Sequence, residues 1–217
     1  MQKKGITLTI IAYIAYAIVI TFMVIQGLHF LYRKRYYNTM DKQILKQILR
    51  ENQHEVERYV VESREYMFDG FPCMVLVGVR RAGKSYMLYH LIQQMLAKGR
   101  KWDEMLYLNF EDERLENFGT EDFNRLLECH QEMYGKRPML FLDEIQNIDG
   151  WHKFARRMAD SKYTIFITGS NAKMLSGEMN TTLGGRFIIA EIYPYSFKEY
   201  LSVLRLSLIH ISEPTRP

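Results

Sequence analysis

The sequence predicts an α/β protein with a three-layer fold, in which a mostly parallel five-stranded sheet lies between helices and follows a long N-terminal helix. Three observations favour this class. Short uninterrupted apolar runs, such as Met74–Val77, have the length of strands that are buried on both faces. Segments of helical length, with apolar residues at three- and four-residue spacing, separate these runs. No internal repeat interrupts the alternation, which is typical of parallel strands joined by crossover helices.

The elements follow in a regular order along the chain. A helix is expected from Asp41 to about Tyr66, because apolar residues recur on one side of it, and Phe71-Pro72 ends the segment. Further helices are expected from Lys84 to about Lys98, from a Thr120 cap to Tyr134, and over Trp151–Ala159. The apolar runs predict strands at Met74–Val77, Met105–Asn109, Met139–Leu142, Thr164–Thr168 and Phe187–Ile192.

One eight-residue pattern carries the clearest chemical signal. GVRRAGKS fits the Walker A pattern, or P-loop, G-x-x-x-x-G-K-[ST], at every fixed position. Its glycines let backbone N–H groups approach a polyphosphate, and the following helix presents a positive N-terminal end. We expect Lys84 to bind the β- and γ-phosphates and to assist catalysis, and Ser85 to ligate Mg²⁺. The residues expected to contact ATP are Gly78, Val79, Arg80, Arg81, Ala82, Gly83, Lys84, Ser85 and Tyr86.

Arg80 and Arg81 occupy variable positions of this loop. Their side chains are expected to contact nucleotide or, as the alternative, to face solvent or a protein partner.

A second predicted strand ends in two carboxylates. MLFLDE places Asp143 and Glu144 directly after four apolar residues, at a strand end that faces the same crevice as the phosphate loop in a parallel sheet. We expect Asp143 to hold Mg²⁺, directly or through water, and Glu144 to act as the general base that polarises water. Water as the acceptor favours ATP hydrolysis over transfer to another molecule. The sequence has no Asn-Lys-x-Asp motif for guanine.

The two ends of the chain differ from its middle. Residues 6–28 form an apolar run, and at 1.5 Å per residue a helix of this length covers the roughly 30 Å hydrocarbon core of a membrane. The basic residues that follow, Arg33, Lys34 and Arg35, favour a cytoplasmic location for what comes after. A mis-called start is the alternative: residues 1–39 are then upstream sequence, and a soluble cytoplasmic protein begins at Met40.

The last twelve residues, LSLIHISEPTRP, resemble a translated sequencing adapter throughout their length. The expected organisation is therefore an anchor or upstream segment at 1–39, a helical segment at 40–70, an ATP-binding domain at 71–205, and an adapter-derived tail at 206–217.

The net charge of +4 is unevenly distributed. Residues 1–39 contain five basic residues and no acid, and residues 206–217 are neutral, which leaves a charge of −1 on residues 40–205. A nearly neutral domain offers no electrostatic footprint for nucleic acid. The charge of the predicted domain therefore does not support a nucleic-acid partner.

Five blocks of sequence, in this order, resemble the prokaryotic AAA-type P-loop ATPases that usually carry an additional, poorly characterised C-terminal domain. They are GVRRAGKS, YLNFEDERL, LFLDEIQNIDGWHKF, FITGSNAKML and LGGRFIIAEIYPYSFKEYL. The resemblance covers residues from about Met40 to Arg205. The additional domain is expected to be missing beyond the adapter junction.

The resemblance implies further roles. Ser170 or Asn171 would read the γ-phosphate as a polar sensor, and an ordinary strand-ending turn is the alternative. Arg186 would be an arginine finger, acting in cis or on a neighbouring subunit's ATP in a homo-oligomer, and a structural salt bridge is its alternative. By topology, because they follow the second predicted strand, Asn109 and Glu111 are expected to face the nucleotide crevice, with a role in binding nucleotide or ordering water.

The leading interpretation is an ATPase that couples hydrolysis to the switching of an unidentified macromolecular partner. A nucleotide-dependent binding module with little turnover is one alternative, which Glu144 disfavours because a pure binder needs no general base. A DNA-associated ATPase is the other, and the missing domain would then supply the DNA contacts.

Overall fold

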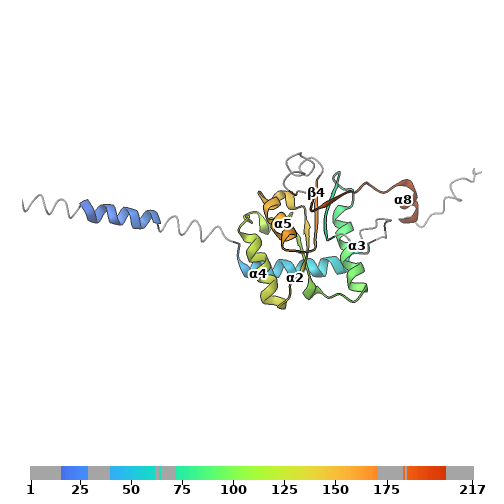
Figure 1. Ribbon diagram of the computed structural model, residues 1–217, viewed down its shortest axis with the longest axis horizontal. Coiled ribbons are helices and arrows are strands. Elements are labelled where there is room, and N and C mark those ends of the chain that lie inside the picture. The colour runs from blue at the N-terminus through green and yellow to red at the C-terminus, as the bar shows by residue number, and fades with distance from the viewer. Residues whose placement is uncertain are drawn as a thin grey trace, which may run out of the picture. The chain divides into compact units, whose positions relative to one another are not determined.

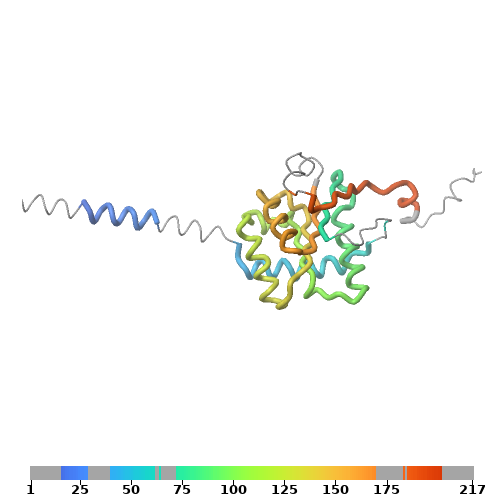
Figure 2. Tube along the Cα trace, in the orientation of Figure 1, coloured from blue at the N-terminus to red at the C-terminus, as the bar shows by residue number. Residues whose placement is uncertain are grey.

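The computed structural model divides the chain into two units, residues 1–39 and Met40–Pro217. It describes residues 16–28, 40–61, 64, 72–170, 183 and 185–203 (Figure 1 and Figure 2). In the first unit, residues 16–28 form a helix. Within these described ranges, no helix combines the length and the apolar character needed to cross a membrane. Residues 6–15 of the predicted membrane span, and the predicted tail Leu206–Pro217, lie outside them.

The second unit is built on a parallel sheet of five strands. The strands lie in the order β2-β3-β4-β1-β5, and each neighbouring pair is parallel. This arrangement confirms the predicted fold class, and the predicted strand ends are within two residues of those observed. The strands are β1 (Cys73–Gly78), β2 (Met105–Asn109), β3 (Met139–Asp143), β4 (Ile165–Ser170) and β5 (Ile188–Glu191).

Helices cover both faces of the sheet, with α3 on one side and α4 and α5 on the other (Figure 1). The helices of this unit are α2 (Lys42–Arg58), α3 (Lys84–Ala97), α4 (Asp122–Tyr134), α5 (Trp151–Asp160) and α8 (Phe197–Val203). Short 3₁₀ helices, η1 (Trp102–Glu104), η2 (Glu113–Leu115) and η3 (Ile145–Asn147), lie in the connections.

Two predicted helix ends are wrong. The first helix ends at Arg58 and not near Tyr66, because Tyr59 already has an extended backbone. Helix α4 begins at Asp122 without a cap from Thr120. The carboxylate of Asp122 instead accepts a hydrogen bond from the N–H of Gly119 at 2.9 Å, which closes the turn before the helix.

The core consists of two clusters of buried side chains, one on each face of the sheet. Side chains alternate between the faces along each strand, so Val75 and Leu142 pack in the layer of α4 and α5, while Leu76 and Phe141 pack beneath α3. The apolar runs without alternation in the sequence are explained by this burial on both faces.

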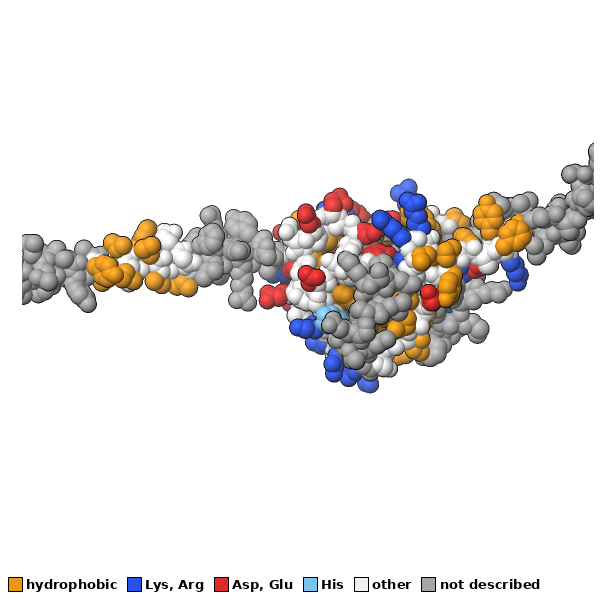
Figure 3. All heavy atoms as spheres, turned by 90° about the horizontal axis from the view of Figure 1, so that it is seen from above, with side chains coloured by type: hydrophobic (Ala, Val, Ile, Leu, Met, Phe, Trp, Pro, Cys, Tyr) orange, Lys and Arg blue, Asp and Glu red, His pale blue; other side chains and the backbone are white. Residues whose placement is uncertain are grey.

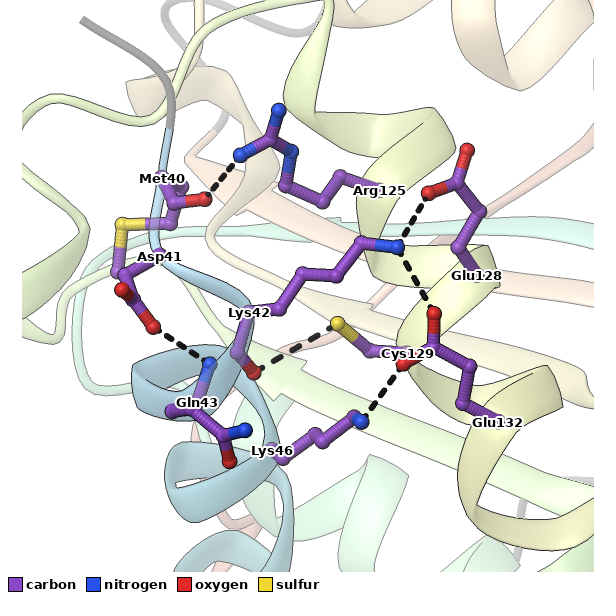
Figure 4. Close-up of polar contacts among 9 residues, drawn as sticks. All are labelled: Met40, Asp41, Lys42, Gln43, Lys46, Arg125, Glu128, Cys129 and Glu132. Atoms are coloured by element: carbon purple, nitrogen blue, oxygen red, sulfur yellow. Dashed lines mark hydrogen bonds and ion pairs between the residues drawn. The ribbon is translucent and has the colours of Figure 1, made fainter. Parts of the chain in front are cut away.

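Helix α2 packs against α4 and the edge strand β2. Charged side chains join α2 to α4 (Figure 4). The ammonium group of Lys42 lies 2.8 Å from carboxylate oxygens of both Glu128 and Glu132 on α4. These ion pairs are exposed, and such pairs contribute little to stability. Leu45 and Ile48, which are fully buried in the core, hold the helix in place.

Helix α8 follows β5 and begins with a capping box. The hydroxyl of Ser196 accepts the N–H of Glu199 at 3.3 Å, and the Glu199 carboxylate accepts the N–H of Ser196 at 2.7 Å. Hydrophobic side chains are exposed on and near this helix (Figure 3). They belong to Ile188, Ile189, Tyr193, Tyr195, Phe197 and Tyr200.

Candidate functional site

Polar residues lie together at the carboxyl ends of neighbouring strands of the sheet. The face covered by α3 carries Tyr107 and Phe141 in register on β2 and β3. Two residues further along each strand, and therefore on the same face, stand Asn109 and Asp143, which are also in register. Thr168 occupies the matching place on β4. Because the strands are parallel, these residues meet at the end of the sheet where α3 begins.

The loop Gly78–Ser85 joins β1 to α3 and has two glycines with different structural duties. Gly83 has a φ of +91°, the left-handed conformation that favours glycine, and caps the start of α3. At Gly78 the constraint is a close approach: a Cβ there would lie 2.2 Å from the carbonyl oxygen of Ile192. The sequence motif predicts a glycine at position 78 because phosphate approaches the backbone there. The structure adds a second reason, which is the close packing of Ile192 against Gly78.

Lys84, in the first turn of α3, is directed into the interior of the loop. Its side chain is only 5% exposed, and its ammonium group donates to the carbonyl oxygen of Val79 at 3.4 Å. The same nitrogen lies 3.5 Å from Oε1 of Glu144. The structure therefore brings together the predicted phosphate-binding cation and the predicted general base, which come from different elements of the fold.

Asp143 is fully buried at the end of β3, and hydrogen bonds hold both of its carboxylate oxygens. Oδ1 accepts from the hydroxyl of Thr168, and Oδ2 accepts from the hydroxyl of Tyr107 at 3.0 Å. Burial raises the pKa of Asp143 above its usual range, while the neighbouring hydroxyl groups of Thr168, Ser85 and Tyr107 act in the opposite direction. The hydroxyl groups around Asp143 thus favour the ionised form of its carboxylate, which burial alone would disfavour.

Glu144 takes a left-handed backbone conformation, with a φ of 51°. This conformation costs a residue other than glycine roughly 1–2 kcal/mol, and backbone strain of this kind is found at functional sites. The N–H of Glu144 donates to the hydroxyl of Thr168 at 2.9 Å, and its Oε2 accepts from Gln146. Thr168 therefore supports both acidic residues at once, by donating to Asp143 and accepting from Glu144.

A cavity of about 600 Å³ opens beside the loop. Lys84 and Glu144 lie at its wall, and Glu111 lines it as predicted. Asn109 has a supporting contact, since its Oδ1 accepts the N–H of Glu111 at 2.9 Å. The lining residues are Val60, Val61, Arg64, Arg80, Arg81, Ala82, Gly83, Lys84, Ser85, Tyr86, Met87, His90, Glu111, Glu144 and Tyr195. From the predicted loop set, Gly78 and Val79 are absent from this lining.

Arg64 is a cavity residue that the sequence patterns did not indicate. Its side chain is 7% exposed. It donates to the carbonyl oxygen of Ala82 in the loop at 3.2 Å and to Oε1 of Glu199 on α8 at 2.9 Å. The guanidinium also stacks over the ring of Tyr195, 4.8 Å from its centroid. Hydrogen bonds from Arg64 hold the pKa of Glu199 at about 2. Arg64 thus connects the loop to α8.

The remaining predicted residues are Ser170, Asn171 and Arg186. Ser170 ends β4 opposite Gly78, but its side chain is not described, and Asn171 lies outside the described residues. Arg186 pairs with Asp160 at the end of α5, with Nε 2.5 Å from Oδ1, and does not belong to the cavity lining. Within this chain Arg186 forms the salt bridge that was the alternative to the arginine finger.

The oxygen atoms of Ser85 and Asp143 fit a magnesium ion. Hard divalent cations prefer oxygen ligands, and Mg²⁺ commonly uses one or two protein oxygens together with substrate phosphates. The described part of the chain contains no cluster of three or more His, Cys, Asp or Glu side chains that could hold a metal by itself. The donor set therefore suits an ion that arrives with a phosphate ligand.

Comparison with known proteins relates the chain to one family. The family model described as AAA domain matches residues 70–201. An uncharacterized protein of Methanocaldococcus jannaschii is 39% identical over 170 residues, which are 77% of this chain and 37% of that protein. An uncharacterized protein of Haemophilus influenzae is 40% identical over 129 residues, covering 58% of this chain and 32% of that protein. The chain spans about a third of the length of these curated relatives.

Among solved structures, the closed state of Hsp104 with ATPγS and FITC casein is similar, with a TM-score of 0.45 and 16% sequence identity. The similarity covers 71% of this chain and 28% of that chain.

Proposed function

Because this chain belongs to the AAA domain family, we propose that it binds Mg-ATP in the cavity beside the Gly78–Ser85 loop and hydrolyses it to ADP and phosphate. The family implies a nucleotide-binding ATPase domain in general terms. The observation that carries the specific proposal is the convergence of Lys84, Asp143 and Glu144. The ammonium group of Lys84 and the carboxylate of Glu144 meet at the wall of the cavity, and the buried carboxylate of Asp143 lies directly before Glu144 at the end of β3.

Each of these groups has a part that follows from its chemistry. The backbone N–H groups of the loop and the start of α3 attract the phosphates, and Lys84 neutralises charge on their terminal oxygens. Ser85 and Asp143 would hold Mg²⁺, which supplies further positive charge to the phosphates. Arg80 and Arg81 line the same cavity and add positive charge to it.

Glu144 is placed to activate water. The oxygen of water attacks the γ-phosphorus as the bond to the β–γ bridging oxygen breaks, and the water proton moves to the Glu144 carboxylate. The contact of Glu144 with Lys84 has a consequence for this step. The phosphates compete with Glu144 for the ammonium group, so nucleotide binding leaves the carboxylate available to accept the proton.

Glu144→Gln tests the proposed chemistry. The amide cannot accept the proton of water, so phosphate release should fall by about 10²–10⁴-fold, while binding of a fluorescent ATP analogue is retained. Glu116→Gln, which changes an exposed glutamate outside the cavity, is the matched control and should leave both unchanged. Phosphate release from Glu144→Gln at the rate of the unmutated protein would show that Glu144 is not the base.

We also propose that hydrolysis is coupled to the switching of a macromolecular partner. Arg64 supports this proposal, because it holds the loop carbonyl of Ala82 and the carboxylate of Glu199 at the same time. Movement of the loop on nucleotide binding would then be transmitted to α8. The exposed apolar side chains near α8 offer a surface on which such a movement could act.

A further inference from the structure

Tyr107 is a buried residue of β2 to which the proposed chemistry gives no role. β2 is an edge strand, and Tyr107 lies opposite Phe141 in the register with β3. Asp143 is therefore its diagonal neighbour on the same face of the sheet. The Tyr107 side chain is 1% exposed, and its hydroxyl lies 3.0 Å from Oδ2 of Asp143. A buried tyrosine hydroxyl needs a polar partner, and here that partner is the predicted magnesium ligand.

The direction of this hydrogen bond follows from the available protons. An ionised carboxylate can only accept, so Tyr107 donates its single hydroxyl proton to Asp143. The Tyr107 oxygen then accepts from the hydroxyl of Tyr89 on α3, which lies 3.3 Å away. The two rings meet edge to face with 5.4 Å between their centroids, which restrains the Tyr107 ring. Of the two tyrosine hydroxyl groups, only that of Tyr107 is thus bonded to the Asp143 carboxylate.

Asp143 is held from two sides by this arrangement. Thr168, on β4, donates to one carboxylate oxygen, and Tyr107, on β2, donates to the other. These strands flank β3 on its two sides. The terminal torsion of an aspartate side chain is otherwise broad, so two donors on opposite sides select one orientation. The hydroxyl of Ser85, the other predicted magnesium ligand, is near enough to this carboxylate to lower its pKa.

We infer that Tyr107 is a positioning residue for the divalent cation: its hydroxyl holds the Asp143 carboxylate in the orientation that binds Mg²⁺ together with the nucleotide. This inference rests on the proposed function. Hydrogen-bonding partners behind a metal ligand typically contribute about 10–100-fold to metal affinity. Tyr107→Phe isolates this contribution, because it keeps the ring in the core and removes only the hydroxyl.

The experiment uses the full chain and Mn²⁺ as a paramagnetic probe in place of Mg²⁺, titrated with saturating ADP present. Tyr107→Phe is expected to raise the dissociation constant of Mn²⁺ about tenfold or more. Tyr89→Phe removes the neighbouring buried hydroxyl but leaves the bond between Tyr107 and Asp143, so it is the matched control and should change the constant by less than about threefold. ADP affinity in EDTA should be unchanged in both variants, because Lys84 and the loop are intact.

The outcomes separate the inference from the proposed function. Equal Mn²⁺ affinity in the unmutated protein and Tyr107→Phe would overturn the positioning role and leave the ATPase proposal standing. An equal loss of Mn²⁺ affinity in Tyr107→Phe and Tyr89→Phe would also overturn it, as would weakened ADP binding in EDTA, since both indicate general damage to the site. An unmutated protein that binds neither ADP nor Mn²⁺ would refute the proposed function itself.

Discussion

Gly78→Ala tests the close backbone approach at the start of the phosphate loop. A Cβ on Gly78 would lie 2.2 Å from the carbonyl oxygen of Ile192 and 3.2 Å from its carbonyl carbon. These are backbone atoms, so no rotamer change can move them away. The N–H of Ile192 also donates to the carbonyl oxygen of Val77 at 2.6 Å, which ties the segment after β5 to β1. The added methyl group must push these two segments apart.

The magnitude follows from the two interactions that the methyl group disturbs. Overpacking in a well-packed core costs about 1–3 kcal/mol, and weakening the hydrogen bond between Ile192 and Val77 costs about 1 kcal/mol more. We therefore expect the free energy of unfolding to fall by about 2–4 kcal/mol. Urea unfolding without nucleotide, followed by the fluorescence of Trp102 and Trp151, measures this loss. With a denaturant slope of about 2 kcal/mol/M, the midpoint should fall by about 1–2 M.

Gly119→Ala is the matched control for this measurement. A Cβ at Gly119 would meet only Asp122 Oδ2, at an ordinary contact distance of 3.8 Å, and the N–H that donates to this carboxylate is retained. The control should change the free energy of unfolding by less than about 0.5 kcal/mol. A Gly78→Ala protein that unfolds at the same urea concentration as Gly119→Ala would show that the backbone approach imposes no constraint.

Two further predictions concern the nucleotide and its link to α8. Lys84→Ala is expected to abolish binding of a fluorescent ATP analogue, because it removes the buried ammonium group beside the loop, and unchanged affinity in a titration would rule out the assigned loop. Glu199→Gln is expected to remove the ATP-dependent change in hydrogen exchange of α8, because Arg64 then loses its charged partner on that helix. If the change persists in this variant, loop and helix are coupled by another route.

Short-range patterns in the sequence were sufficient to predict the class of fold and the centre of the candidate site. The apolar runs indicated strands because a strand that is buried on both faces has apolar residues at consecutive positions. The loop Gly78–Ser85 and the pair Asp143-Glu144 could be placed together because parallel strands present their ends at one edge of the sheet. Both predictions use residues that are adjacent in sequence, and the structure brings the Lys84 and Glu144 side chains to 3.5 Å.

The end of α2 is a feature that local periodicity could not predict. The side chain of Gln93, on α3, donates to the carbonyl oxygens of Val56 and Tyr59 at 2.7 and 2.8 Å. Carbonyl groups at a helix end need such partners, and here a different helix supplies them. The chain therefore leaves the helix at Arg58, although the apolar spacing continues.

The sequence by itself thus determined which residues are the candidates for the phosphate and carboxylate chemistry, because they lie in contiguous motifs. Only the tertiary structure decided what holds them. Tyr107 and Thr168 are 36 and 25 residues from Asp143 in the chain, yet both donate to its carboxylate. They do so because β2 and β4 lie on the two sides of β3. This strand order follows from the packing of all five strands and their helices, which no short segment of sequence encodes.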